Sequence, residues 1–385
     1  MKTGLHDKTR TVLLVGLWLS LPGCQAPPAK TPDDLFTRQK QQFVDIDAPR
    51  KIGVVENIGL QLPQVSPDGR RMLYLRTDQA FVSPMTLFGS TDPIYTPTNG
   101  TLTVWLRETT GSLAGKRISS ARWAHSPVWS PTGQTFAYIE HAPNHTNVVH
   151  VNPATGQETR LGRDEAINCL PRFDGDDDTL LFCAGADPRG PFRIYRQHVA
   201  DPAPKPLSPD NTDCVLPIRS DFGESTLCLK TDATGVIWAQ ASPDGVRPMS
   251  SPYEVPNRVG LVRFTAGITE PLAPDGKRLL YFNPARETIT VWQIGLGEVQ
   301  PPLPNSMAAC WLDADTLALA NAEVLLLVSA HTPGILTSLN GAWIPCRYVP
   351  EARRLILLGK HSDRRLAVWE MKFKTRATDP VTTAE

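Results

Sequence analysis

The sequence predicts an all-β fold, a β-propeller most simply counted as seven blades, with six as the alternative. Two observations predict it: a short turn recurs along the chain before apolar strands, and a second marker follows each turn at a similar spacing. Repeats of roughly 40 to 50 residues with several short strands are typical of propellers, because one small sheet cannot bury both faces without neighbouring blades.

The turn is clearest at three places, Ser66–Gly69, Ser130–Gly133 and Ala273–Gly276, each followed by an apolar strand. Weaker copies of the turn begin at Phe173, Ser220, Leu312 and Val349. The second marker is the end of a β-branched run, at Trp105, His150, Tyr195, Trp238, Trp292 or Trp369. It lies about sixteen residues after each turn, except in the first unit, where the insertion 78–100 precedes Trp105. The sixth unit has only the apolar run 324–327 there, so six blades stay an alternative.

Composition agrees with many short strands. The chain has 36 prolines among 385 residues, about twice the usual share, which favours turn-rich all-β structure. Lys plus Arg and Asp plus Glu both number 39, so the formal net charge is zero. A nucleic-acid partner is not expected, because such binding needs an electropositive face.

The first residues predict export. A charged start precedes the apolar segment 11–21, which is too short to span a bilayer and fits a signal peptide over residues 1–23. Leu21–Cys24 resembles the bacterial lipobox, which implies lipidation of Cys24, whereas the alternative is an ordinary signal peptide with an incidental cysteine. The resemblance to bacterial lipoproteins implies that Gln25, rather than Asp, after the cysteine directs the protein to the outer membrane, if the cell has one, facing the periplasm. The proline-rich stretch 24–50 is expected to be a flexible tether.

The propeller is expected to cover residues 51–375, followed by a disordered tail, 376–385. The last unit offers three strands and then a polar tail, whereas a spare strand, 51–55, precedes the first unit. We expect this spare strand to pair with the last blade and to close the ring, because closure leaves no long open edge.

Six cysteines remain besides Cys24, and an oxidising compartment makes disulfides reasonable. The sequence suggests three pairs, of which the first two have the same fourteen-residue spacing across a turn: Cys169 with Cys183, Cys214 with Cys228, and Cys310 with Cys346. The alternative is that all six are small buried apolar residues.

Motifs for catalysis are absent from the sequence. Gly-x-Ser-x-Gly does not occur, and Gly295-Leu296-Gly297 lacks the third glycine and the helix of a dinucleotide loop. No catalytic residue and no cofactor are therefore expected.

Two clusters resemble metal sites only weakly. His141, His145 and His150 are close in sequence, but His150 occupies a position held elsewhere by Trp or Tyr and is expected to be a packing residue. The acidic turn with Asp174, Asp176, Asp177 and Asp178 offers oxygen ligands of the kind that calcium prefers, or is a solvated turn.

Two insertions are the candidate partner-binding loops, because binding residues gather on loops of rigid scaffolds. The first, 78–100, carries Phe81, Met85, Phe88 and Tyr95. The second, 243–257, carries Met249 and Tyr253 and is expected between the third and fourth strands of its unit, on the opposite face. Arg189 is expected on the face of the first insertion. The alternative is that both insertions merely cap the ring or remain mobile.

The Ser-Pro-Asp-Gly turn with its apolar strand resembles the WD-repeat-like propeller repeat of the TolB family, from about Leu62 to Trp369. The resemblance implies a binding platform in the cell envelope and, by family analogy alone, the lipoprotein Pal as a partner. The chain departs from the family in its own lipid anchor, in its seven units and in lacking room for the α/β domain that precedes the six-bladed propeller of TolB. The repeat is structural in that family, so no functional residue carries over.

The leading hypothesis is a non-enzymatic envelope lipoprotein whose propeller binds a protein or peptide. A metal-dependent enzyme is the main alternative, because some TolB-like propellers resemble polysaccharide lyases that bind a metal through histidines in the channel. A third hypothesis is a glycan or small-molecule sensor that uses the mouth of the channel.

Overall fold

The computed structural model describes residues 46–56, 62–77, 101–111, 115–187, 190–219, 226–232, 235–249, 268–283, 288–294, 297–298, 306–330, 335–362 and 365–374. These residues belong to the second of two compact units, Gln39–Glu385. Cys24, the signal peptide, most of the tether and the tail lie outside the described residues, so they stay predictions. Within the described part, no helix is long and apolar enough to cross a membrane.

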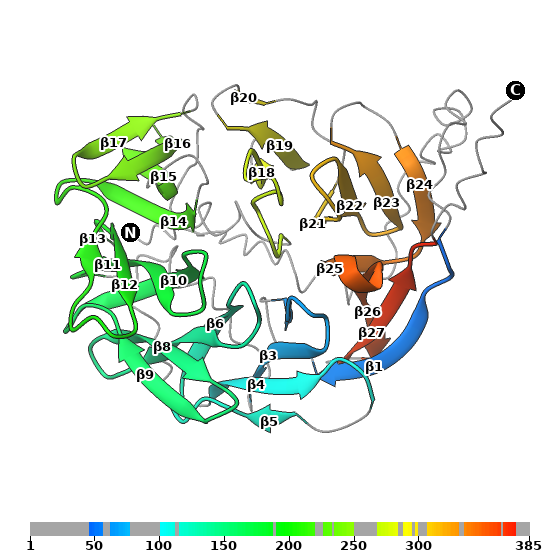
Figure 1. The fold of residues 1–385 in the computed structure, drawn as a ribbon, viewed down its shortest axis with the longest axis horizontal. Coiled ribbons are helices and arrows are strands. Elements are labelled where there is room, and N and C mark those ends of the chain that lie inside the picture. Colours follow the sequence, from blue (N-terminus) through cyan, green and yellow to red (C-terminus); the bar gives the residue numbers. More distant parts are fainter. Residues whose placement is uncertain are drawn as a thin grey trace, which may run out of the picture. The chain divides into compact units, whose positions relative to one another are not determined.

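The described strands form seven antiparallel sheets (Figure 1). The first sheet is β2 (Gln64–Val65), β3 (Arg71–Thr77), β4 (Leu102–Glu108) and β5 (Lys116–Arg117). The second is β6 (Ala124–Trp129), β7 (Phe136–His141), β8 (Thr146–Asn152) and β9 (Gln157–Leu161). The third is β10 (Ile167–Phe173), β11 (Thr179–Gly185), β12 (Arg193–His198) and β13 (Lys205–Pro206).

The fourth sheet is β14 (Asp213–Arg219), β15 (Thr226–Asp232), β16 (Gly235–Ser242) and β17 (Gly245–Pro248). The fifth has three described strands, β18 (Arg278–Asn283), β19 (Thr288–Gln293) and β20 (Gly297–Glu298), and Leu272 bridges to Leu279 where a first strand would lie. The sixth is β21 (Ala308–Trp311), β22 (Thr316–Ala320), β23 (Val324–Ser329) and β24 (Ile335–Asn340).

The seventh sheet confirms the predicted closure. It contains β25 (Trp343–Val349), β26 (Arg354–Ser362), β27 (Arg365–Lys372) and β1 (Arg50–Glu56), with the 3₁₀ turn Pro350–Ala352 between β25 and β26. The N-terminal strand β1, blue in Figure 1, pairs with β27, red, from Arg50 opposite Glu370 to Glu56 opposite Arg365. Both ends of the described chain therefore share one sheet, and seven blades rather than six are present.

The hydrophobic core lies between successive sheets. The third to fifth sheets share one apolar cluster that includes Trp238 and Trp292, whose rings stack with centroids 6.0 Å apart. Other clusters join the first sheet to the second, the second to the third, the fifth to the sixth and the sixth to the seventh. A last cluster packs Val55 and Ile356 of the seventh sheet against Met72 of the first. The contacts thus form a closed cycle, as a propeller requires.

The repeated turn has the same geometry in its three clear copies. The amide of the fourth residue donates to the carbonyl of the first in each, at 2.8 to 3.0 Å. The final residues, Gly69, Gly133 and Gly276, have φ values of 70, 75 and 68°, a left-handed conformation that glycine adopts without a steric penalty. All six aromatic or comparable markers lie on strands that pair with the strand after the turn.

The first strands of the second, third and fourth sheets share a bulge that the sequence analysis did not anticipate. The register shifts after His125 in β6, after Cys169 in β10 and after Val215 in β14. The next residue, Ser126, Leu170 or Leu216, has a φ of 53 or 54°, and a proline follows each one. First strands of successive sheets contact one another, for example β6 with β10 and β10 with β14, so the bulges line the inner edge of the fold.

Two faces follow from these connections. The turns between first and second strands, which we call the turn face, contact one another: Arg71 donates to the Gly133 carbonyl at 2.6 Å, and Arg354 donates to the Gly69 carbonyl at 3.3 Å. Because neighbouring strands are antiparallel, connections between second and third strands lie at the opposite ends of the sheets. We call these ends the insertion face.

Candidate functional site: the insertion face

Both predicted insertions leave the fold from the same face, which corrects the expectation of opposite faces. The first insertion connects β3 to β4, the second and third strands of the first sheet. In the fourth sheet, β16 and β17 are joined by a two-residue turn, Pro243-Asp244, so the insertion begins only after β17 and leads to the fifth sheet. The end of a fourth strand lies on the insertion face, because β17 runs antiparallel to β16.

Most of the predicted contact residues lie outside the described residues, namely Phe81, Met85, Phe88, Tyr95, Arg189 and Tyr253. Met249 is described and is a packing residue. Its amide donates to the carbonyl of Trp238 at 2.8 Å, and its half-buried side chain packs on the core shared by the third to fifth sheets. The prediction that Met249 contacts a partner therefore gains no support from its surroundings.

A histidine pair lies on the insertion face of the second sheet. His125, near the start of β6, and His141, at the end of β7, approach with their Nε2 atoms 2.8 Å apart. His125 is 4% exposed, and its Nδ1 lies 2.8 Å from the Ser126 hydroxyl. Burial lowers the pKa of His141 to about 4, and burial together with His141 lowers the pKa of His125 well below its usual value. At neutral pH both rings are therefore uncharged, with one donating the shared proton to the other.

The sequence analysis did not bring His125 and His141 together, because they meet only through the register of β6 and β7. A chain from the Ser126 hydroxyl through both rings looks like an activated nucleophile, but two observations weigh against that role. The unusual backbone of Ser126 recurs at Leu170 and Leu216, so it belongs to the bulge of the fold. The lowered pKa values also make both imidazoles weak bases near neutral pH.

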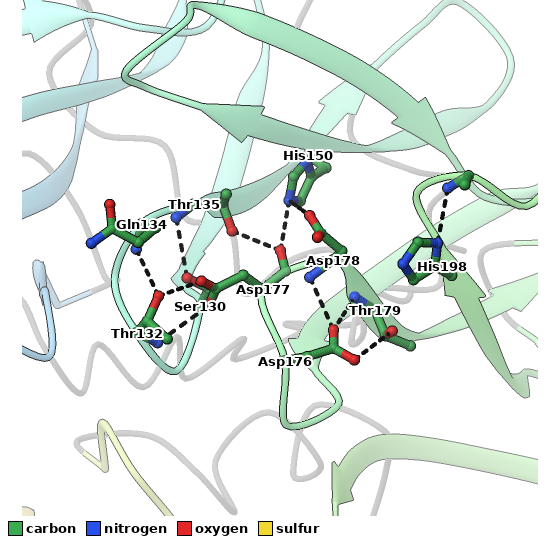
Figure 2. Close-up of polar contacts among 11 residues, drawn as sticks. Ser130, Thr132, Gln134, Thr135, His150, Asp176, Asp177, Asp178, Thr179 and His198 are labelled. Atoms are coloured by element: carbon green, nitrogen blue, oxygen red, sulfur yellow. Dashed lines mark hydrogen bonds and ion pairs between the residues drawn. The ribbon is translucent and has the colours of Figure 1, made fainter.

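The acidic turn lies on the turn face and joins the second sheet to the third (Figure 2). The Asp177 carboxylate accepts from the amide of Thr132 at 3.2 Å and from its hydroxyl. The Asp177 carbonyl accepts from the Thr135 hydroxyl at 2.7 Å and lies 2.8 Å from Nε2 of His150. His150 is 6% exposed and its ring packs edge-on against Phe173, so its predicted packing role is confirmed.

The other acidic side chains of this turn have separate partners. Asp176 accepts from the amides of Asp178 and Thr179 and from the Thr179 hydroxyl, at 2.5 to 2.9 Å. Asp174 pairs with Arg196 at 2.7 Å, and Asp178 lies 3.8 Å from His150. The carboxylates thus face different donors. Among the described residues, no group of three or more His, Cys, Asp or Glu is arranged to hold a metal ion.

The six cysteines in the described part are buried free thiols. Cys310 and Cys346 belong to different apolar clusters, and their thiols donate to carbonyls of their own strands, at 3.3 and 3.5 Å. Burial raises the pKa of each of these two thiols to about 12. The predicted bridge between them stays a prediction. The other four cysteines lie together between the third and fourth sheets.

At the level of sequence, no protein-family model matches the chain, and neither does any curated protein. Solved propellers do resemble it. Oligogalacturonate lyase from Vibrio parahaemolyticus has a TM-score of 0.53 at 12% identity, over 86% of this chain and 91% of that chain. The structure of an oligogalacturonate lyase in complex with manganese has a TM-score of 0.53 at 11% identity, over 83% of this chain and 90% of that chain.

TolB from Acinetobacter baumannii gives a TM-score of 0.44 at 16% identity, over 71% of this chain; the chain spans 64% of the length of that TolB. At these identities, the likeness to the two lyase structures extends to the fold alone: the chain has the β-propeller fold.

Proposed function

We propose that the protein is a non-enzymatic lipoprotein of the bacterial cell envelope whose propeller binds a protein or peptide partner through its insertion face. Lipidation at Cys24 anchors it to the membrane, and the 24–50 tether holds the propeller away from the lipid. The lipobox and the proline-rich composition of the tether support this placement.

One observation carries the binding role: both long insertions leave the fold from one face. They depart from the end of β3 in the first sheet and from the end of β17 in the fourth. The connection between β11 and β12 of the third sheet, which contains Arg189, leaves from that face as well. The closed cycle of apolar contacts gives these loops a rigid base, and loops on a rigid base are where binding residues gather.

Site-specific photo-crosslinking tests this proposal with matched positions on the two faces. A photoreactive phenylalanine analogue at exposed Asn144 or Ala186, on the insertion face, should capture one envelope protein stoichiometrically. The same analogue at exposed Gln134 or Ala352, on the turn face, should not. The captured protein must then bind the purified propeller. Equal capture from both faces, or none from either, would overturn the proposal.

A metal-dependent enzyme is the second candidate, and the His125–His141 pair is the observation that favours it. Imidazoles are common transition-metal ligands, and both are uncharged at neutral pH. The described residues supply only these two ligands, however, which does not fit the three or more protein ligands of a usual catalytic site. Metal analysis of the purified protein decides: a stoichiometric metal lost in His141→Ala would favour the enzyme over the scaffold.

A further inference from the structure

Four buried cysteines face one another at the boundary between the third and fourth sheets. Cys169 and Cys183 come from β10 and β11, whereas Cys214 and Cys228 come from β14 and β15. All four belong to one apolar cluster and are at most 5% exposed. We call them the thiol cluster. Their two pairs look equivalent in sequence, because each spans fourteen residues, but the strand registers make them different.

Cys169 and Cys183 are directly opposite each other in the β10–β11 ladder. Directly opposite residues in antiparallel strands have side chains on the same face and Cα atoms about 4.5 to 5.5 Å apart. This separation lies within the range of about 4.4 to 6.8 Å that disulfides span. The two thiols are also in hydrogen-bond contact. The backbone therefore already has the spacing that a bridge needs.

Cys214 and Cys228 are diagonal neighbours. Cys214 of β14 is opposite Lys230 of β15. Cys228 of β15 lies opposite the bulge that β14 makes between Val215 and Ile218. Diagonal positions have Cα atoms about 7 to 8 Å apart, beyond the range of an unstrained disulfide. Their thiols touch through a hydrogen bond, and Cys214 also has the Thr212 hydroxyl as a partner. The contact satisfies both thiols without a covalent bond.

The bulge explains the difference. The register shifts after Cys169 in β10 and after Val215 in β14, so Val215 occupies the position of Cys169, and Cys214 lies one residue earlier. A displacement of one residue reverses the face of a sheet on which a side chain lies. The two pairs consequently point toward each other across the boundary, rather than repeating one arrangement in successive sheets.

We propose that Cys169 and Cys183 form a disulfide across the first two strands of the third sheet, whereas Cys214 and Cys228 stay reduced. The oxidant is an external disulfide, either a small molecule or a thiol–disulfide oxidoreductase. The Cys169 thiolate attacks the external disulfide and displaces one thiolate. The Cys183 thiolate then attacks the Cys169 sulfur of this mixed disulfide and displaces the second. Two electrons pass to the oxidant, and the two cysteine protons end on the released thiols.

Peptide mapping of protein exported to an oxidising compartment tests the proposal. The protein is denatured at lysis in iodoacetamide and digested with trypsin without reduction. Cleavage after Arg172, Arg189 and Arg219 separates the four cysteines into four peptides. We expect one linked pair, Cys169 with Cys183, and alkylated Cys214 and Cys228. A Cys214–Cys228 bridge, a bridge across the sheet boundary, or four alkylated thiols would overturn the proposal.

A thermal measurement gives an independent readout that does not depend on peptide recovery. The bridge closes a loop of about 15 residues, so the melting temperature should fall by about 4 °C when a reductant is added. Cys183→Ala should abolish this sensitivity to the reductant, whereas Cys228→Ala should keep it. If the sensitivity to the reductant disappears in Cys228→Ala and persists in Cys183→Ala, the bridge lies in the fourth sheet and the proposed Cys169–Cys183 disulfide is rejected.

Discussion

Replacing Glu370 by glutamine should loosen the closure of the propeller. Glu370 lies on β27 and is 4% exposed. Its carboxylate accepts from Arg50 of the N-terminal strand, with Nε at 3.1 Å, and pairs with Arg354 of β26 at 3.2 Å. The side chain therefore connects three strands of the seventh sheet, including the strand that closes it.

The cost can be estimated from the exposure of the partners. Arg50 is 73% exposed, so its pair contributes only about 0.5 kcal/mol. The Arg354 side chain is 16% exposed, and removing the partner of a buried charge costs about 3 to 5 kcal/mol. Arg354 keeps the carbonyls of Asp68 and Gly69 at 3.4 and 3.3 Å, and glutamine retains an oxygen acceptor. We therefore expect a total loss below that range, about 2 kcal/mol.

Differential scanning calorimetry at pH 7 provides the measurement. The entropy of unfolding for a unit of this length is about 0.7 kcal/mol/K, so Glu370→Gln should lower the melting temperature by about 3 °C. Glu108→Gln, at an exposed glutamate of β4, is the matched control and should change it by less than 1 °C. Equal shifts for the two variants would refute the assignment of Glu370 to closure.

The same pair predicts a pH dependence with a definite sign. Burial raises the pKa of Glu370, but the hydrogen bonds from Arg50 and Arg354 and the charges of Arg50 and Lys372 outweigh it and hold this pKa below its usual 4.5. A carboxyl whose pKa is depressed in the folded state contributes stability above its unfolded pKa and loses it as the pH falls through the folded value. The difference in melting temperature between wild type and Glu370→Gln should therefore be full above pH 4.5 and shrink in more acidic solution.

Three further predictions concern the turns and the closing strand. Gly175→Ala should cost about 2 kcal/mol in urea unfolding, because φ is 85° and a Cβ would lie 1.0 Å from Nη1 of Arg219; Gly156→Ala, with φ of 74° and open space, should cost less. Asp177→Ala should lower the free energy of unfolding by about 1 kcal/mol, since two hydrogen bonds to the neighbouring turn are lost; an unchanged free energy would contradict a stabilising junction between these turns. Deleting residues 51–56 should lower thermal stability markedly, and an unaltered melting curve would argue against closure by β1.

The fold was predictable because its signals are local and repeated. The tight turns and the marker residues each depend on a few neighbouring residues, and a repeat samples them several times. The spare strand at 51–55 could be assigned to the last sheet because only one sheet lacked a partner for its edge. A fourth signal went unused: prolines at 127, 171 and 217 stand two or three residues before a turn and mark the bulged first strands.

The arrangement of the sites was not predictable to the same degree, because it depends on register. Ser242-Pro243-Asp244-Gly245 has the sequence of the repeated turn but joins third and fourth strands, so the following insertion was assigned to the wrong face. His125 and His141 meet across a ladder, and a bulge makes the pair Cys214 and Cys228 differ from Cys169 and Cys183. For the cysteines, a one-residue shift that the spacing does not show decides which face of the sheet they occupy.

The proline-marked bulges have a consequence for how a ligand can enter the centre of the fold. A peptide that binds by strand addition needs a straight edge with free amide donors. Pro127, Pro171 and Pro217 remove a donor from the inner edges, and the adjacent left-handed residues bend those edges away from a regular ladder. The inner edges of the second, third and fourth sheets are thus protected against β-augmentation. A ligand at these inner edges must therefore be recognised by side chains, which favours folded ligands over extended peptides.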